Sequence, residues 1–223
     1  MTPARRRGGR QRIPRPPTAR PGARPPWARR PPAVIDLSLV RQVLDAAGPP
    51  QRPELVFAHS RPAAVLVPLF DEDGQARVVL TRRTTSLPSH KGEVAFPGGK
   101  VHDGEGLLDA ALRETHEEVG LRESDVEIIG ELDHLATVAS RFVLAPFVGA
   151  LRSRPVLRPN PAEVDRAFDV ALVDLLSEDV FREERWDMPH FDDRPVHFFE
   201  LDDDTVWGAT ARILHQLLVL LTA

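Results

Sequence analysis

The sequence predicts a layered α/β domain built on a mixed β-sheet. Segments with the apolar runs of strands are interleaved with segments whose apolar residues recur at helical spacing, and this order is typical of α/β domains. The chain has 223 residues, of which 42% are hydrophobic, so it can form one domain with a real core plus an appendage. We find no internal repeat and expect a single domain at residues 34–223.

The first part of this domain is expected to form a helix and then two strands. Asp36 can cap a helix that ends near Gly48, where two prolines follow. Residues 63–70 and 76–83 are rich in Val and Leu and flank an acidic turn that contains glycine, as the two arms of a hairpin do. This hairpin would place Arg82 and Arg83 at the end of its second strand.

The rest of the domain is expected to continue the alternation. Gly106 precedes a helical pattern over residues 107–119, and Gly120 is a natural C-terminal stop. Residues 177–193 are acidic, and we expect an irregular excursion there. The other expected elements are strands at 126–135, 142–151, 164–170 and 196–201, a loop at 152–161, a short helix at 171–176 and a C-terminal helix from Gly208.

Residues 1–33 differ from the rest in composition. They hold ten arginines, nine prolines and no acidic residue, which leaves 29 − 10 = 19 basic against 33 acidic residues in 34–223. Such a segment cannot bury apolar surface, so we expect a disordered Arg/Pro-rich tail. The tail could be merely solvated, or bind RNA, DNA or an acidic surface weakly through counterion release. A targeting role and a start codon placed too far upstream are further alternatives. An enzyme should keep its turnover when residues 1–33 are deleted.

Missing residue types and missing apolar runs exclude several classes of protein. The chain has no cysteine, which excludes disulfides, thiolate catalysis and zinc sites built on Cys. No uninterrupted apolar run approaches the length of a membrane span, and nothing resembles the hydrophobic region of a signal peptide. We therefore expect a soluble, cytoplasmic protein that does not interact with membranes.

Carboxylates are concentrated in the stretch from Phe96 to Leu121. A Pro-Gly-Gly turn opens it, and on the helix that follows, three glutamates share one face with a neighbouring arginine. A solvated acidic face is the simple explanation. A second explanation is a site for Mg²⁺, which takes oxygen ligands and commonly shares its coordination with substrate phosphates. The residues concerned are Glu105, Arg113, Glu114, Glu117 and Glu118.

The spacing of these residues resembles the Nudix box of the Nudix hydrolases. Gly99, Glu105 and the run from Arg113 to Leu121 match all of its fixed positions, and Thr115 stands where the family usually has an aliphatic residue. The resemblance implies a Nudix-like α/β/α sandwich and a bound Mg²⁺ or Mn²⁺ held by Glu114, Glu117, Glu118 and a backbone carbonyl of Gly98 or Gly99. It also implies that Glu105 either holds a metal-bound water or braces Arg113, which would orient the carboxylates rather than touch the substrate.

The segment upstream of the box resembles the extra motif of coenzyme A pyrophosphatases. The matching positions are Thr81, Arg83, Gly92, Phe96 and Pro97 to Gly99. The departures are Thr84 for Ser or Ala, Pro88 for a second arginine, and Glu93 for a glutamine. Because Arg binds phosphates bidentately and Lys acts as a point charge, four cations are candidates for contact with the substrate: Arg82, Arg83, His90 and Lys91.

These resemblances imply metal-dependent hydrolysis of the pyrophosphate bond of coenzyme A or its acyl derivatives. The products would be 4'-phosphopantetheine, or its acyl form, and adenosine 3',5'-bisphosphate. The general base is open among Glu114, Glu93 and Glu163. Two other functions stay open: a Nudix enzyme for another nucleotide such as ADP-ribose or NADH, and a non-enzymatic nucleotide- or nucleic-acid-binding protein. A homodimer is expected only at the level of the family.

Overall fold

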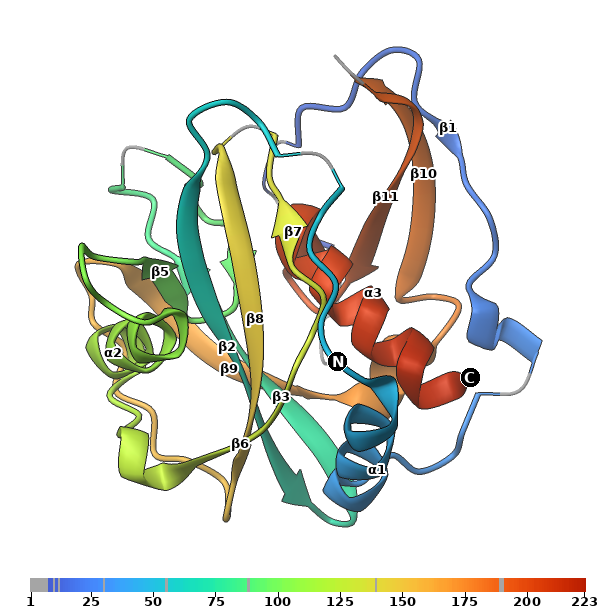
Figure 1. Cartoon of the computed structure of the whole chain (residues 1–223). Helices are drawn as coiled ribbons and strands as arrows, with labels where there is room; N and C mark the ends of the chain where they lie inside the picture. The colour runs from blue at the N-terminus through green and yellow to red at the C-terminus, as the bar shows by residue number, and fades with distance from the viewer. Residues whose placement is uncertain are drawn as a thin grey trace, which may run out of the picture.

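The protein consists of two β-sheets and the helices that pack on them (Figure 1). The computed structural model describes residues 8–9, 11, 13–29, 31–54, 56–87, 89–138, 140–188 and 191–223. Within these residues the α-helices are α1 (Leu37–Ala47), α2 (Leu107–Val119) and α3 (Gly208–Thr222). No helix in this part of the chain is long and apolar enough to cross a membrane.

The larger sheet is mixed, as the sequence predicts. Its central strand β2 (Arg61–Glu72) runs parallel to β8 (Phe142–Leu151) and antiparallel to β3 (Gln75–Arg83). The strand order is β4-β3-β2-β8-β6, with three further strands attached to this path. The remaining strands are β4 (Val94–Ala95), β5 (Gly98–Lys100), β6 (Val126–Glu131), β7 (Leu135–Ala136) and β9 (Val164–Ala171).

Helices cover both faces of the larger sheet. Side chains of β2 alternate between the two faces, so that Leu66 and Phe70 join a core cluster with α2. Val67 and Leu69 point the other way, into a cluster that includes residues of α1 and α3. Figure 1 shows α2 on one side of β2 and β8, with α1 and α3 on the other. The predicted α/β/α sandwich is therefore confirmed.

The smaller sheet was not predicted. Its order is β1-β10-β11-β12, with bounds β1 (Arg20–Pro21), β10 (Phe181–Met188), β11 (Phe191–Glu200) and β12 (Thr205–Trp207). The expectation of an irregular excursion at residues 177–193 is wrong, because β10 and the start of β11 lie there. Charged residues occur on both sides of β10, where Glu183 and Glu184 form ion pairs, and this hides the strand's apolar alternation.

Two other elements differ in detail from the sequence prediction. The strand expected at 126–135 is split into β6 and β7, because the residues between them bind the loop around Gln51. The Gln51 N–H donates to Asp133 Oδ1 at 2.8 Å, and the His134 N–H donates to the Gln51 carbonyl at 2.9 Å. The short helix expected at 171–176 is a 3-10 helix, Leu172–Leu176. The Asp36 cap is present, with its Oδ1 accepting from the Leu39 N–H at 2.8 Å.

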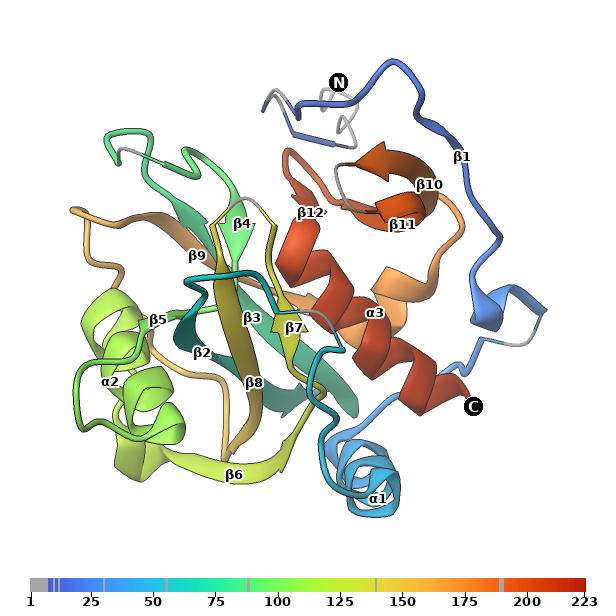
Figure 2. The ribbon, with the colours of Figure 1, turned by 45° about the horizontal axis from the view of Figure 1, so that its top comes forward.

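The N-terminal segment, residues 8–29, wraps around the smaller sheet (Figure 2). Its 3-10 helix, Pro26–Arg29, carries Trp27, which is only 1% exposed. The Trp27 ring packs on Phe181 of β10 and on His215 of α3, with centroids 5.0 and 5.5 Å away. The expectation that residues 1–33 bury no apolar surface is wrong at Trp27. Residues 1–7, 10, 12 and 30 of the expected tail lie outside the described residues.

Polar contacts fasten the N-terminal segment to the edge of β10. The Gly22 N–H donates to the Glu183 carbonyl at 2.8 Å, next to the two-residue pairing of β1 with β10. Arg15 Nε donates to Glu184 Oε2 at 2.8 Å, and Arg20 pairs with Asp193 at 2.6 Å. The segment thus covers a strand edge that would otherwise be open. Deleting residues 1–33 would therefore remove part of the core, and the expectation that an enzyme keeps its turnover after this deletion stays a prediction.

Candidate active site

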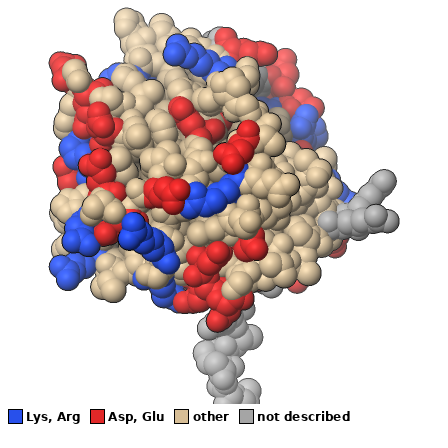
Figure 3. Space-filling view, turned by 60° about the horizontal axis from the view of Figure 1, so that its bottom comes forward, with Lys and Arg blue, Asp and Glu red and all other residues tan. Residues whose placement is uncertain are grey.

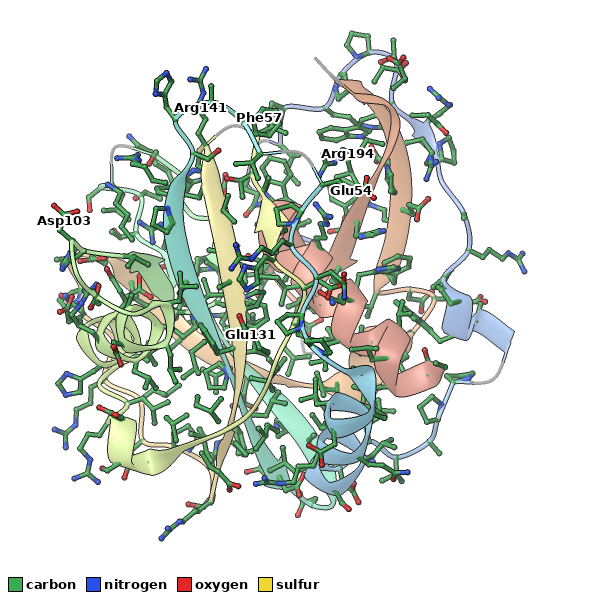
Figure 4. All side chains as sticks on the ribbon, in the orientation of Figure 1. Glu54, Phe57, Asp103, Glu131, Arg141 and Arg194 are labelled. Carbon is green, nitrogen blue, oxygen red and sulfur yellow. The ribbon has the colours of Figure 1, made fainter. Side chains whose placement is uncertain are left out.

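The helix that carries the predicted carboxylates packs directly on one face of the larger sheet. Gly106 is the extended N-cap of α2, and Gly120 ends the helix in the left-handed conformation, with φ 72°. The Gly120 N–H donates to the His116 carbonyl at 2.9 Å. Asp103, labelled in Figure 4, marks the loop that leads into α2 on one side of the molecule, while Arg194 of β11 lies on the other.

Two glycines bring the backbone of β5 between β2 and the carboxylates. The Leu66 N–H donates to the Pro97 carbonyl at 2.9 Å, which holds the turn against β2. Gly98 has φ +150°, and a Cβ atom there would lie 2.4 Å from the Ala64 carbonyl oxygen. A Cβ atom on Gly99 would lie 2.4 Å from the carboxyl carbon of Glu114. Position 98 therefore requires glycine, whereas a side chain at position 99 would have to displace the Glu114 carboxylate.

Gly99→Ala should disable the site without unfolding the domain. The added methyl group must displace the Glu114 carboxylate, and a small misplacement of a reacting group can lower the rate by about 100-fold. Turnover and thermal unfolding of the variant would be measured beside Lys100→Ala, whose exposed side chain borders the same turn. Full activity in Gly99→Ala would contradict this assignment of Glu114.

Arg113 contacts three members of the carboxylate cluster, which consists of Glu105, Glu114, Glu117 and Glu118. Its Nε donates to Glu105 at 2.7 Å, and its Nη1 lies 3.0 Å from Glu114 and 3.3 Å from Glu117. Its Nη2 also donates to the Lys100 carbonyl at 3.1 Å. The guanidinium and the His102 N–H lower the pKa of the Glu105 carboxyl to about 2. Glu105 is therefore ionised at neutral pH and holds the Arg113 guanidinium in place.

Glu118 is the buried member of this cluster, with 3% of its surface exposed. The Gly98 N–H donates to its Oε2 at 3.3 Å, and Arg83 Nη1 lies 3.5 Å from its Oε1. Burial is the main reason that the pKa of the Glu118 carboxyl rises to about 8. Arg83 and the Gly98 N–H oppose this rise, whereas the nearby carboxylates of Glu163 and Glu114 add to it.

The donor set fits a divalent cation, although its side chains are not gathered around one. Among the described residues, no three His, Asp or Glu side chains lie close enough together to hold a metal ion. The reason is that Arg113 holds Glu114 and Glu117, while Glu118 faces Gly98 and Arg83. Burial and the nearby Glu163 and Glu114 nevertheless disfavour the ionised form of Glu118, and a hard divalent cation with oxygen ligands would offset this cost. The Glu117 side chain is 53% exposed and would have to leave Arg113 to bind such an ion.

The four cations predicted to contact substrate are not brought together. Arg83 reaches Glu118, and its buried Nε lacks a hydrogen-bond partner. Arg82 points to another part of the sheet, where it pairs with Asp165 and Asp204 at 2.8 and 3.3 Å. His90 pairs with Glu93, and the Lys91 side chain is exposed. Of these four cations, Arg83 alone has a contact with the box glutamates among the described residues.

A model of the NUDIX domain matches residues 60–194. The chain belongs to the Nudix family. Nudix hydrolase 3 of Caenorhabditis elegans is 36% identical over 173 residues, which cover 71% of this chain and 72% of that protein. The uncharacterized Nudix hydrolase NudL of Photorhabdus laumondii is 35% identical over 172 residues, with coverage of 75% and 89%. This chain is therefore a Nudix hydrolase, a family that generally uses divalent metals.

Solved structures agree on the Nudix fold. A MutT/nudix family protein from Enterococcus faecalis superposes with a TM-score of 0.51 at 18% identity, and the match covers 74% of this chain and 63% of that chain. At this level of identity the likeness shows the fold alone.

Two features of this Nudix site have no local signal in the sequence. The Asn160 N–H donates to the Glu118 carbonyl at 2.8 Å, and the Thr84 N–H donates to the Glu163 carbonyl at 2.9 Å. These bonds bring the loop before β9 to the C-terminal end of α2, next to Glu118.

Buried Thr115 is satisfied within the helix, since its Oγ1 donates to the Ala111 carbonyl at 2.6 Å. Pro88 lies outside the described residues.

Proposed function

We propose that this Nudix hydrolase cleaves the pyrophosphate bond of coenzyme A or its acyl derivatives. The observation that carries the proposal is the position of Arg83, which belongs to the upstream segment similar to coenzyme A pyrophosphatases and lies 3.5 Å from Glu118 of the Nudix box. This contact between the upstream segment, which suggests coenzyme A as the substrate, and the Nudix box, which carries the glutamates, supports a single site formed by both. Products would be 4'-phosphopantetheine, or its acyl form, and adenosine 3',5'-bisphosphate.

The residues of the site would hold the cation, orient its ligands and bind the substrate phosphate. Glu114, Glu117 and Glu118 would hold the cation, and Arg113 would aim them from its position between Glu105 and Glu114. The Gly98 carbonyl stays a predicted ligand. Bound Mg²⁺ or Mn²⁺ supplies positive charge that polarises the phosphoryl oxygens and activates water. Arg83, whose Nε is unpaired, would donate to a substrate phosphate.

The reaction adds one water across the pyrophosphate. The water oxygen bonds to a phosphorus atom, the bridging P–O bond breaks, and the bridging oxygen leaves with the other phosphate. A base must accept a proton from the water. Of the three candidates, Glu114 lies against Arg113, Glu163 lies near Glu118, and Glu93 is paired with His90. Arg82 stays a candidate for substrate contact only if it leaves its two aspartates.

A substrate panel tests the proposal. Coenzyme A, acetyl-coenzyme A, ADP-ribose, NADH and dGTP would be incubated with Mg²⁺ or Mn²⁺, with products identified by mass. Coenzyme A should be cleaved fastest, with release of adenosine 3',5'-bisphosphate, and Glu117→Gln should lower the rate by about 10- to 100-fold. Glu127→Gln is the matched control, because Glu127 is an exposed carboxylate of β6 that pairs with Arg41 of α1.

Each other outcome has a distinct meaning. Faster cleavage of ADP-ribose or NADH would keep the carboxylate assignment and replace the substrate. No turnover of any substrate would favour the non-enzymatic alternative. Equal losses in Glu117→Gln and Glu127→Gln would show that the first variant acts through general damage rather than through the site.

Two predictions about partners stay predictions. A homodimer is testable by sedimentation. Weak binding of nucleic acid through the N-terminal segment would compete with the pairs that Arg15 and Arg20 make with Glu184 and Asp193. Figure 3 shows a face on which Lys and Arg side chains are interspersed with Asp and Glu rather than joined into a basic surface.

A further inference from the structure

The loop between β3 and β4, residues 84–93, is closed at its base by backbone hydrogen bonds. The Arg83 N–H donates to the Glu93 carbonyl at 2.9 Å, and the Gly92 N–H donates to the Arg83 carbonyl at 3.2 Å. His90 and Gly92 both have positive φ, at 55° and 66°. The described part of the loop thus turns back on Arg83, and its end lies beside the residue that contacts Glu118.

His90 and Glu93 form an ion pair in this loop. His90 Nδ1 lies 2.9 Å from Glu93 Oε2, and the Glu93 N–H donates to the His90 carbonyl at 3.3 Å. The two side chains are 43% and 30% exposed. A pair this exposed adds about 0–1 kcal/mol to stability, so the fold itself has little need of it.

The charge of His90 depends on the groups that face it. The hydrogen bond that the His90 ring donates to the Glu93 carboxylate is the main cause of a raised pKa of the His90 imidazole, while burial and Arg83 oppose the rise. Lys91 is adjacent in the chain, and its side chain is exposed. The upstream motif that this segment resembles has glutamine where Glu93 stands. A neutral amide would not favour the cationic imidazole, so Glu93 changes the charge of the loop.

We propose that Glu93 is a positioning residue that keeps His90 cationic, and that His90 and Arg83 together bind the phosphates of the anionic substrate. This inference rests on the proposed site but not on the identity of the nucleotide. In this proposal Glu93 favours anion binding, because its carboxylate pairs with His90 and its negative charge is therefore balanced. It also makes substrate affinity dependent on pH.

Glu93→Gln tests the proposal. As pH rises, a histidine with a raised pKa keeps its proton longer, so the variant should lose the imidazolium at lower pH than the unmodified protein. At about pH 7.5 its KM should rise roughly threefold to tenfold with little change in kcat, whereas at about pH 5.5 the two proteins should agree. His90→Asn should raise KM at both pH values, and adding Glu93→Gln to it should change nothing further.

The chain offers a matched control. Glu131 of β6, labelled in Figure 4, pairs with His134 Nε2 at 2.6 Å with the same three-residue spacing. Glu131→Gln removes a similar pair outside the 84–93 loop, and its KM should match that of the unmodified protein across the pH range.

An NMR titration separates this proposal from the proposed function. The midpoint of the His90 imidazole should fall in Glu93→Gln, and pyrophosphate added to metal-free protein should shift the His90 signal less in the variant at about pH 7.5. These results need no turnover of any substrate. An unchanged midpoint would overturn the proposal. So would a loss confined to kcat, because that loss would identify Glu93 as the general base.

Discussion

Glu118→Gln is expected to lower turnover by roughly 100-fold or more while leaving the protein folded. The carboxylate is one of the three predicted to hold the cation, and an amide binds Mg²⁺ more weakly. Glutamine has nearly the same shape, and the pKa of about 8 means that the metal-free carboxyl is mostly neutral at pH 7. Turnover on the cleaved substrate and metal affinity by calorimetry would be measured. A variant with normal metal affinity would refute the assignment.

The same substitution should change how stability depends on pH. Because the folded-state pKa of Glu118 lies above its ordinary value of 4.5, the contribution of this carboxyl is fully present below that value and is lost as pH rises through about 8. Without metal, the unmodified protein should thus become less stable relative to Glu118→Gln as pH rises from 4.5 through about 8, by an amount on the order of a few kcal/mol. Urea unfolding in EDTA measures this difference. Glu117→Gln, at an exposed carboxylate, should show no such effect.

Trp27→Ala is expected to lower the free energy of unfolding by about 3–5 kcal/mol. The indole is 1% exposed and contacts Phe181 and His215, so truncation leaves a cavity between β10 and α3. Its Nε1 has no hydrogen-bond partner, so the loss comes from packing alone. Urea denaturation followed by circular dichroism measures this change, and the rate per folded molecule should stay nearly constant, because α2 packs on the other sheet.

Val156→Ala is the control for Trp27→Ala. Val156 is 84% exposed, and its truncation should change stability by no more than about 0.5 kcal/mol. If Trp27→Ala were equally harmless, the N-terminal segment would not be docked, and the sequence-based prediction of a disordered tail would be restored.

The larger sheet and its helices were predictable because their patterns are local. The alternation of Leu66 and Val67 between two faces, the Asp36 cap and the Gly120 stop all act within a few residues. The smaller sheet was not predictable in this way. Its β10 pairs with β11 on one edge, but its other edge and the charge of Glu184 are matched only by distant residues, such as Arg15 across 169 residues. Composition alone therefore placed Trp27 in a tail.

The members of the proposed site come from the sequence, whereas their arrangement comes only from the structure. Sequence spacing put the glutamates on one helix face, and the structure shows that Arg113 holds two of them while Glu118 turns inward. The adjacent Arg82 and Arg83 have the same chemistry, yet neighbouring residues of a strand point to opposite faces, so their contacts differ. Only tertiary structure reveals that Arg83 is the one beside Glu118.

The docked N-terminal segment has a consequence for the order in which the protein folds. Gly9 bonds to Thr205 across 196 residues and Arg15 bonds to Glu184 across 169, so residues made early in synthesis must wait for partners made late. Contacts of such high sequence separation form slowly, because a long loop must close first. The Nudix box and β2 can assemble on the ribosome well before β10 emerges. Closure of the smaller sheet would then be a late folding step, during which Trp27 and the edge of β10 are open to chaperones and proteases.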